Sequence, residues 1–465
     1  MKNLMRLKPT APGFLLLVLS LFGPSSTAFA VGSGGFENAT FSSIAISQSN
    51  AVTAQGEEPA AISYNPAGIA NLKGLQVESN MGFISVITHI SKQSQDGKTQ
   101  SSGTLVEVPT GYLTFNPGKV FNDRLVLGIG SDSPFGLSNK WDSANQAVRY
   151  TGYKNWLKMY TLKPTVAFKF TDWLSVGAGA MNYRVFNFGS VQAYPNNAIV
   201  PGSPDGQLRL NMSGSHWGWH FGARVKPAPK HQFGFYFRSP VKIHIRGKVK
   251  VERSSFAPGG RFESGAYSNL DLPMNMTWGY AFMPNPKNTI EADFGYTRWS
   301  QHNRLDVIST DSISTFDDMI LAAISLNAHD YDDTFSIHLG GNHKVNDRLT
   351  LRAGTLFYTA AVPKNHLIPA VPDSNRLAFS AGLSYQINQM MALDVCYMNM
   401  IGLRRGVNND IGESLGGSGD GKYTSDYNIF LISMRLMWED LFDKMLPGSK
   451  PSEPAQKLEV SPEIK

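Results

Sequence analysis

Hydrophobic and polar residues alternate along most of the chain, a pattern typical of β-strands with one apolar face. Between Leu162 and Phe170, apolar side chains fall mainly on the even positions, whereas the odd positions include Lys163 and Lys169. A second alternating run begins at Leu174 after a turn of three residues. The two runs therefore predict a β-hairpin with a short turn.

Six hairpins of this kind are predicted. They pair residues 110–115 with 125–129, 162–170 with 174–180, 217–225 with 232–241, 274–282 with 289–296, 335–344 with 349–357, and 377–386 with 391–397. A single strand at 75–86 precedes the hairpins, and another at 428–438 follows them. The pattern predicts fourteen strands in an all-β chain.

The turns within the hairpins are short, whereas the segments between hairpins are long. The long segments span residues 131–160, 193–214, 246–272 and 401–427. Short turns at one rim and long loops at the other are typical of an antiparallel transmembrane β-barrel, whose first and last strands must pair because lipid cannot satisfy an open edge. A soluble β-sandwich is the alternative, but it explains neither the strand length nor this asymmetry. An aromatic girdle is expected at Trp173, Trp299, Tyr385, Tyr397 and Trp438.

Residues 1–30 predict a secretory signal peptide. Basic residues precede an apolar run from Phe14 to Leu21, and Ala28-Phe29-Ala30 offers small residues for cleavage. The apolar run is much shorter than the roughly 20 residues that a transmembrane helix needs. The chain is thus expected to be exported across the inner membrane.

Composition agrees with an exported barrel. Charged residues make up 17% of the chain, aromatic residues make up 11%, and glycine occurs 44 times. The signal peptide holds three basic residues, which leaves 39 basic against 36 acidic residues and argues against a nucleic-acid partner. Cys396 is the only cysteine, so no disulfide within the chain is possible.

The segment 31–74 lacks strand alternation and contains an Asn65-Pro66-Ala67-Gly68 turn. We expect it to fold inside the lumen as a plug, because fourteen strands enclose a bore too wide for strand side chains to fill. The expected domains are therefore a signal peptide (1–30), an N-terminal hatch (31–74), a barrel (75–438) and a periplasmic tail (439–465).

Several segments resemble a known family, the FadL-type outer-membrane transporters of long-chain fatty acids and other hydrophobic compounds. The resemblance covers nearly the whole mature chain and is carried by residues 64–68, 72–74, 133–137, 149–150, 172–179, 217–222, 272–273, 296–300, 362–363 and 368–373. It implies a fourteen-stranded barrel plugged by an N-terminal hatch that contains Asn65, Pro66, Ala67 and Gly68. It also implies capture of ligand in the extracellular loops and sideways exit at a kinked strand. The charged tail after Trp438 departs from the family, whose members usually end on the last strand.

Candidate binding residues follow from the strand faces and the loops. Apolar residues in the 131–160 segment are expected to form the ligand groove: Phe135, Leu137, Trp141, Trp156, Leu157 and Met159. Cations on strand faces opposite the apolar side chains are expected to bind a ligand carboxylate: Lys163, Lys169, Arg352 and Arg435. Each of these cations has a second interpretation as an ordinary solvated lumen residue.

No catalytic residue, metal site or cofactor is expected. The Gly412-to-Gly416 segment around Ser414 has the spacing of a hydrolase nucleophile turn but lacks the strand and helix that such a turn requires. The expected function is passive, ligand-gated uptake of long-chain fatty acids across the outer membrane of a Gram-negative bacterium. Aromatic-hydrocarbon uptake, a general porin and an outer-membrane enzyme are the alternatives. Expected partners are the hydrophobic ligand, outer-membrane lipid and lipopolysaccharide, and the barrel-assembly machinery.

Overall fold

The computed structural model describes residues 34–91, 99–143, 146–194, 201–253, 260–302, 305–311, 330–409 and 419–438. The expected signal peptide, the expected tail and the Ser414 segment lie outside these ranges. Within them, no helix is both long and apolar enough to cross a membrane.

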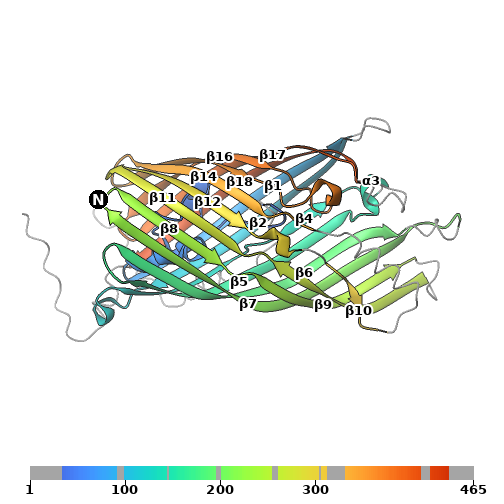
Figure 1. Cartoon of the computed structure of the whole chain (residues 1–465), viewed down its shortest axis with the longest axis horizontal. Coiled ribbons are helices and arrows are strands. Elements are labelled where there is room, and N and C mark those ends of the chain that lie inside the picture. Colours follow the sequence, from blue (N-terminus) through green and yellow to red (C-terminus); the bar gives the residue numbers. More distant parts are fainter. Residues whose placement is uncertain are drawn as a thin grey trace, which may run out of the picture.

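The described strands form one closed antiparallel sheet (Figure 1). They are β1 (Leu75–Ser91), β2 (Thr99–Phe115), β3 (Leu125–Asp132), β4 (Leu137–Lys140), β5 (Lys154–Lys169), β6 (Leu174–Tyr194), β7 (Gly206–Ala228), β8 (His231–Arg238), β9 (Val241–Glu252), β10 (Arg261–Leu272), β11 (Asn275–Asn285), β12 (Asn288–Thr297), β13 (Ile308–Ser309), β14 (Thr334–Lys344), β15 (Leu349–Tyr358), β16 (Arg376–Asn388), β17 (Met391–Val407) and β18 (Gly421–Trp438).

The barrel has fourteen strands, because four of them are broken into two pieces each. The pieces are β3 with β4, β8 with β9, β10 with β11, and β12 with β13. The first strand closes the barrel on the last, with β1 paired to β18 from Leu75↔Trp438 to Ser91↔Lys422. The predicted all-β class, strand number and hairpin order are confirmed. The first and last strands therefore leave no unpaired backbone N–H or C=O groups at an open edge, which lipid could not satisfy.

The strands continue well beyond their predicted ends on the side of the long loops. The predicted loops 131–160, 193–214, 246–272 and 401–427 are wrong, because β4 to β7, β9, β10, β17 and β18 occupy much of them. In β9, for example, the outward residues are charged, so these extensions lack the outward apolar residues on which the strand prediction depended. Ladder pairing and the burial of their inward apolar residues maintain them.

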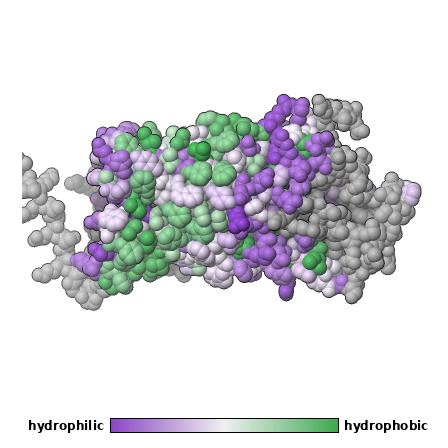
Figure 2. All heavy atoms as spheres, viewed as in Figure 1, coloured by the Kyte–Doolittle hydropathy of each residue, from purple (hydrophilic) through white to green (hydrophobic). Residues whose placement is uncertain are grey.

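On the face shown in Figure 2, apolar side chains cover much of the barrel half that carries the short turns, and polar residues border this belt. Exposed members of the belt include Phe233, Trp278, Phe294, Phe335, Ile337, Leu339, Phe379 and Phe430. Trp173, Tyr385 and Tyr397 are exposed, as expected for a girdle. Trp299 is not: it is fully buried in a short helix, η6 (Trp299–Gln301), because it packs edge-on against Phe36 of the N-terminal segment.

Residues 34–74 lie inside the barrel (Figure 1) and are nearly all buried. They contain three short helices, α2 (Ser43–Ser47), η1 (Pro59–Ser63) and η2 (Pro66–Asn71). Among the described residues, four more short helices lie between strands: η3 (Gly118–Phe121), α3 (Gln146–Arg149), η6 and η7 (Lys364–His366). The lumen is therefore filled by a hatch, as predicted.

Candidate functional site: the plugged lumen

The Asn65–Gly68 turn fastens the hatch to the barrel wall. Asn65 caps η2 by accepting a hydrogen bond from Ala67 N (3.1 Å), and its amide donates to the carbonyls of Thr53 (2.6 Å) and Ala223 (3.1 Å). Gly222 of β7 leaves room for this contact, since a Cβ there would overlap Asn65 Oδ1. The turn combines a helix cap with a bond to the wall, which explains the residue types found in it.

Inward-facing carboxylates of the wall hold the rest of the hatch by its backbone. Asp293 accepts from the N–H groups of Val52 and Thr53 at 3.2 and 3.0 Å. Glu291 accepts from the next two N–H groups of the hatch at 2.6 and 3.0 Å, and Glu78 accepts from Ala60 N at 3.0 Å. Residues 42–72 are thus attached at many points, because buried carboxyl groups of the wall accept hydrogen bonds from backbone N–H groups of the hatch.

The first part of the hatch is attached differently. Glu37 pairs with Phe135 in an isolated β-bridge, Asn38 N donates to Pro134 O (2.8 Å), and Gly136 N donates to Phe36 O (2.9 Å). These bonds draw residues 133–136, between β3 and β4, toward the lumen. In the described residues, β3 pairs with β2 only from Gly111 to Phe115, and β4 pairs only with β5. The edge of β2 above Gly111 therefore has no ladder partner on this side.

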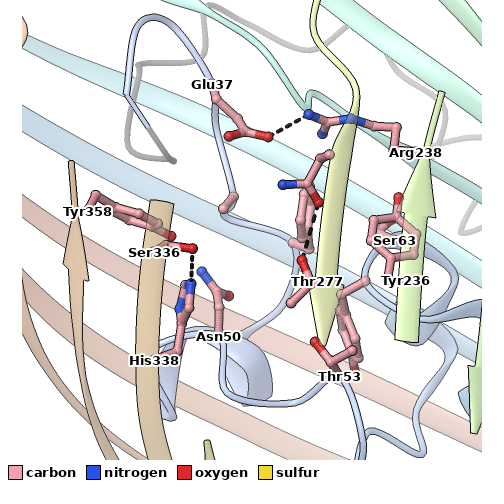
Figure 3. A pocket seen from close by; sticks show the side chains of 14 residues that line it. Glu37, Asn50, Thr53, Ser63, Tyr236, Arg238, Thr277, Ser336, His338 and Tyr358 are labelled. Atoms are coloured by element: carbon pink, nitrogen blue, oxygen red, sulfur yellow. Dashed lines mark hydrogen bonds and ion pairs between the residues drawn. The ribbon is translucent and has the colours of Figure 1, made fainter. Parts of the chain in front are cut away.

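Arg238 lies where this first part of the hatch meets the wall. It is the last residue of β8, and its guanidinium forms an ion pair with Glu37 (Nη2 to Oε1, 2.5 Å; Figure 3). The Arg238 side chain is 4% exposed and stacks over the Phe135 ring, 4.7 Å from its centroid. Its Nε makes no hydrogen bond within the described part of the chain.

A small polar cavity adjoins this ion pair. Its volume is about 70 Å³, and its lining includes Asn50, Tyr236, Ser336 and His338 together with the pair itself (Figure 3). Space beside a buried guanidinium with an unused N–H is suited to an anionic group.

A large apolar cluster lies on the extracellular side of Arg238. Its buried members come from the hatch, the 361–371 segment and the inner faces of β5, β6, β7, β9 and β10; they include Phe36, Tyr183, Leu210, Ile243, Ile245, Trp299 and Leu367. Buried apolar surface next to one buried cation is the combination that an amphipathic ligand requires.

The predicted groove residues divide between this cluster and the outside. Phe135, Trp141, Leu157 and Met159 are buried in the cluster, and Leu137 packs against it. Trp156 lies on the opposite face of β5 and donates from its indole N–H to Asn187. Leu157 and Met159 belong to β5 rather than to the loop expected from the sequence.

The four predicted carboxylate-binding cations do not lie at one site, and each has a protein partner. Lys163 bonds to Asp132 and to hatch Ser63, and Lys169 pairs with Asp172 in the short turn (3.0 Å). Arg352 donates to Ser384, whereas Arg435 forms two bonds with Asp394 at 2.8 and 3.0 Å. Arg352 and Arg435 together line a cavity of about 410 Å³ on the periplasmic side of the hatch.

Sequence reasoning missed Glu37, Arg238 and the hatch-binding carboxylates. A signal was present, because Arg238 lies on the strand face opposite Phe233, Phe235 and Phe237, and Glu291 and Asp293 likewise occupy an inward face. The pattern could not predict the partners of Arg238, Glu291 and Asp293, which lie more than 200 residues away in the chain.

Comparison with known proteins agrees with this architecture. Residues 25–437 match the family model described as outer membrane protein transport protein (OMPP1/FadL/TodX). The chain belongs to this family. The chain is 25% identical over 414 residues to the long-chain fatty acid transport protein of Salmonella typhi, an alignment covering 81% of this chain and 91% of that protein. It is 21% identical over 432 residues to outer membrane protein P1 of Haemophilus influenzae, with coverage of 81% and 89%.

Solved structures share the fold. A crystal structure of a Pseudomonas aeruginosa FadL homologue superposes with a TM-score of 0.75 at 20% identity, covering 87% of this chain and all of that one. The Ralstonia pickettii toluene transporter TbuX superposes with a TM-score of 0.60 at 18% identity, covering 86% and 98%. As a family member, the chain is an outer-membrane transporter of hydrophobic compounds. The family consists of transporters and channels rather than enzymes.

Proposed function

We propose that the chain carries long-chain fatty acids passively across the outer membrane. The observation that supports this choice of substrate is Arg238, a buried cation between the apolar cluster and a polar cavity, whose partner is a carboxylate of the hatch itself. A fatty acid has the same carboxylate joined to an apolar chain, so it can take the place of Glu37 while its chain lies among the cluster residues.

The pathway starts at the extracellular apolar cluster and ends at the edge of β2. Binding of the ligand carboxylate to Arg238 frees Glu37, and with it the Phe36–Asn38 segment that holds residues 133–136 inward. The ligand then leaves sideways between β2 and the β3–β4 junction, where ladder pairing is interrupted. Exit into lipid spares the apolar chain a return to water, and the ligand shifts the hatch by binding one arrangement better than the other.

Rearrangement is confined to residues 34–41 in this proposal. The remainder of the hatch is tied to the wall by Asp293, Glu291, Glu78 and Asn65, and moving it would leave several buried charged or polar groups unpaired. Residues 34–41 are held by the Glu37–Arg238 ion pair and by hydrogen bonds, several of them to the 133–136 segment that moves with them, and a ligand carboxylate can replace Glu37 in the ion pair.

Aromatic hydrocarbons are the alternative cargo. The named toluene transporter shares the fold, and the cavity beside Arg238 is small. A neutral hydrocarbon forms no ion pair with a buried guanidinium. Replacing Arg238 should therefore affect fatty acid uptake and not hydrocarbon uptake, which distinguishes the two cargoes. A general porin is a weaker candidate because the hatch fills the lumen.

The test is uptake of labelled oleate and labelled toluene by a strain that lacks its own transporter and expresses this chain. The double variant Glu37→Gln/Arg238→Gln removes both charges together, which avoids leaving one of them buried alone. Arg348→Gln, on an exposed periplasmic turn, is the matched control. We expect oleate uptake to fall at least about tenfold in the double variant alone, since one lost charge-assisted bond is worth about 1.5–3 kcal/mol.

Three outcomes would count against parts of the proposal. Unchanged oleate uptake in the double variant would remove Arg238 from the pathway but leave transport standing. Toluene uptake without oleate uptake by the unaltered chain would select the aromatic cargo. Uptake of neither, with the barrel verified in the membrane, would reject passive transport of both.

A further inference from the structure

The outward face of the barrel changes its chemistry abruptly at the break between β8 and β9. In β8, the outward residues are Phe233, Phe235 and Phe237, which belong to the apolar belt. In β9, every outward residue up to Lys250 is basic and exposed: Lys242, His244, Arg246, Lys248 and Lys250. We propose that this face binds the phosphate groups of lipopolysaccharide in the outer leaflet.

Two exposed tryptophans fix the height of the basic row relative to the membrane. Trp217 and Trp219 of β7 are 58% and 54% exposed on the outside, and Trp219 packs against Phe237 with ring centroids 4.8 Å apart. Tryptophan is enriched where the hydrocarbon of a bilayer meets its headgroups. The basic row therefore begins at the height of the headgroups, just above Phe237, and continues outward from there.

The basic character extends to neighbouring strands. Lys158 of β5, Arg184 of β6 and Arg209 of β7 also lie on the outward face. The acidic residues on this face lie at its β10 margin and at the end of β9: Glu252, Glu263 and Asp271. Glu263 pairs with both Lys248 and Lys250, and Asp271 pairs with Lys242. For Lys158, Arg184, Arg209 and Arg246, the described part of the chain supplies no ion pair.

Two of these cations are placed against each other. Arg209 and Lys250 are direct cross-strand partners in the β7–β9 ladder, with both side chains on the outside. Like charges in this position repel, and they cannot turn inward because the inner faces of the same strands carry the apolar cluster. A phosphate between them accepts from both and turns the repulsion into attraction. Arg246 lies on the same face of β9, four residues before Lys250 in the chain.

These observations favour lipopolysaccharide as the ligand of the basic face. Its phosphates are anchored at headgroup height, beside acyl chains that contact the apolar belt. Free phosphate would explain the charge but not the aromatic border directly below it. Anionic headgroups attract Lys and Arg at a membrane surface, and Arg binds phosphate with two parallel bonds. The proposal is independent of which compound passes through the lumen.

The experiment measures the affinity of the purified, detergent-solubilised full chain for lipopolysaccharide by native mass spectrometry. The triple variant Arg209→Gln/Arg246→Gln/Lys250→Gln is compared with Lys230→Gln/Lys287→Gln/Arg348→Gln, which removes three exposed charges from the periplasmic turns. Dephosphorylated lipopolysaccharide and inorganic phosphate are the other probes. Heat modifiability on gels verifies that both variants form closed barrels.

We expect the extracellular triple variant to bind lipopolysaccharide at least about tenfold more weakly, and the periplasmic control to stay within about twofold. Dephosphorylated lipopolysaccharide should bind the unaltered chain as weakly as the intact lipid binds the triple variant. Equal affinity of the two variants would overturn the proposal, as would equal binding of the dephosphorylated lipid. Displacement of the lipid by low millimolar inorganic phosphate would also overturn it, in favour of a free-anion site.

Discussion

Arg238 of the barrel wall and Glu37 of the hatch form a buried ion pair 201 residues apart in the chain. Glu37 also forms a β-bridge with Phe135, so the residue that neutralises the wall cation is the one that holds the β3–β4 junction inward. A change in the partner of Arg238 is thereby communicated to the interrupted edge of β2 through two adjacent contacts. Coupling of this kind needs no long pathway.

Replacing Glu37 alone should strengthen ligand binding. In Glu37→Gln, a fatty acid no longer competes with a charged residue for Arg238, and a buried unpaired guanidinium is costly, on the order of 3 kcal/mol. We expect the dissociation constant of oleate, measured by calorimetry in detergent, to fall at least tenfold. The Glu37→Gln/Arg238→Gln variant should instead bind more weakly than the unaltered chain. Weaker binding by both variants would show that Glu37 does not occupy the ligand position.

A methyl group at Gly222 should loosen the hatch. A Cβ there overlaps Asn65 Oδ1, so Gly222→Ala must displace the Asn65 cap and its bonds to Thr53 and Ala223. Loss of such a cap costs about 1–2 kcal/mol. We expect faster amide hydrogen exchange across residues 53–72.

Gly406→Ala is the control for this substitution, since a Cβ at Gly406 has no atom within 4 Å among the described residues. Equal exchange in the two alanine variants would mean that the hatch tolerates loss of the Asn65 contacts.

Locking the middle of the hatch should leave transport intact. Ser43 of α2 and Ser433 of β18 have their Oγ atoms 2.5 Å apart, which favours a disulfide in Ser43→Cys/Ser433→Cys. Cys396, which is buried nearby, is replaced by Ala in the test and control chains to avoid mispairing. Because rearrangement is confined to residues 34–41, oleate uptake should be the same with and without reductant.

Loss of uptake in the oxidised disulfide variant, restored when reductant opens the disulfide, would contradict that confinement. It would show that the whole hatch moves, although Asp293, Glu291 and Asn65 bind it to the wall. The expected disulfide is verified by mass spectrometry before uptake is measured.

Acid should loosen the contact between Phe36 and the η6 segment. Burial lowers the pKa of His302 to about 4, from an ordinary value near 6.5, and its ring packs against Phe36 with centroids 5.2 Å apart. The neutral imidazole is therefore favoured in the folded chain. The neutral His302 ring therefore contributes fully to the stability of this contact above pH 6.5, and the contribution is lost as the pH falls toward 4. At pH 5 the loss of stability is on the order of 2 kcal/mol.

Hydrogen exchange of residues 34–37 and 299–302, corrected for intrinsic rates, measures this effect between pH 7 and pH 5. The unaltered chain should lose protection in both segments. His302→Gln should show no such difference, because glutamine does not titrate. A pH response that persists in His302→Gln would assign it to another group.

The sequence by itself determined the barrel. Alternation of apolar and polar residues fixes which face of each strand meets lipid, and the short turns fix the hairpin order, so local information was sufficient for fourteen strands and for a non-strand segment at the N-terminus. The strand prediction ended too early above the apolar belt. There, β9 carries basic residues outward and apolar residues inward, and its pairing with β7 and β10 is visible only in the closed sheet.

Only the tertiary structure decided which buried charges meet. Lys163, Arg352 and Arg435 were expected to be available to a ligand, yet each bonds to another side chain of the protein. Arg238 lies opposite Glu37 because the hatch folds back through the lumen, a contact that no local pattern encodes. A buried charge without a partner strongly destabilises a fold, and which partner lies next to it depends on the path of the chain in three dimensions.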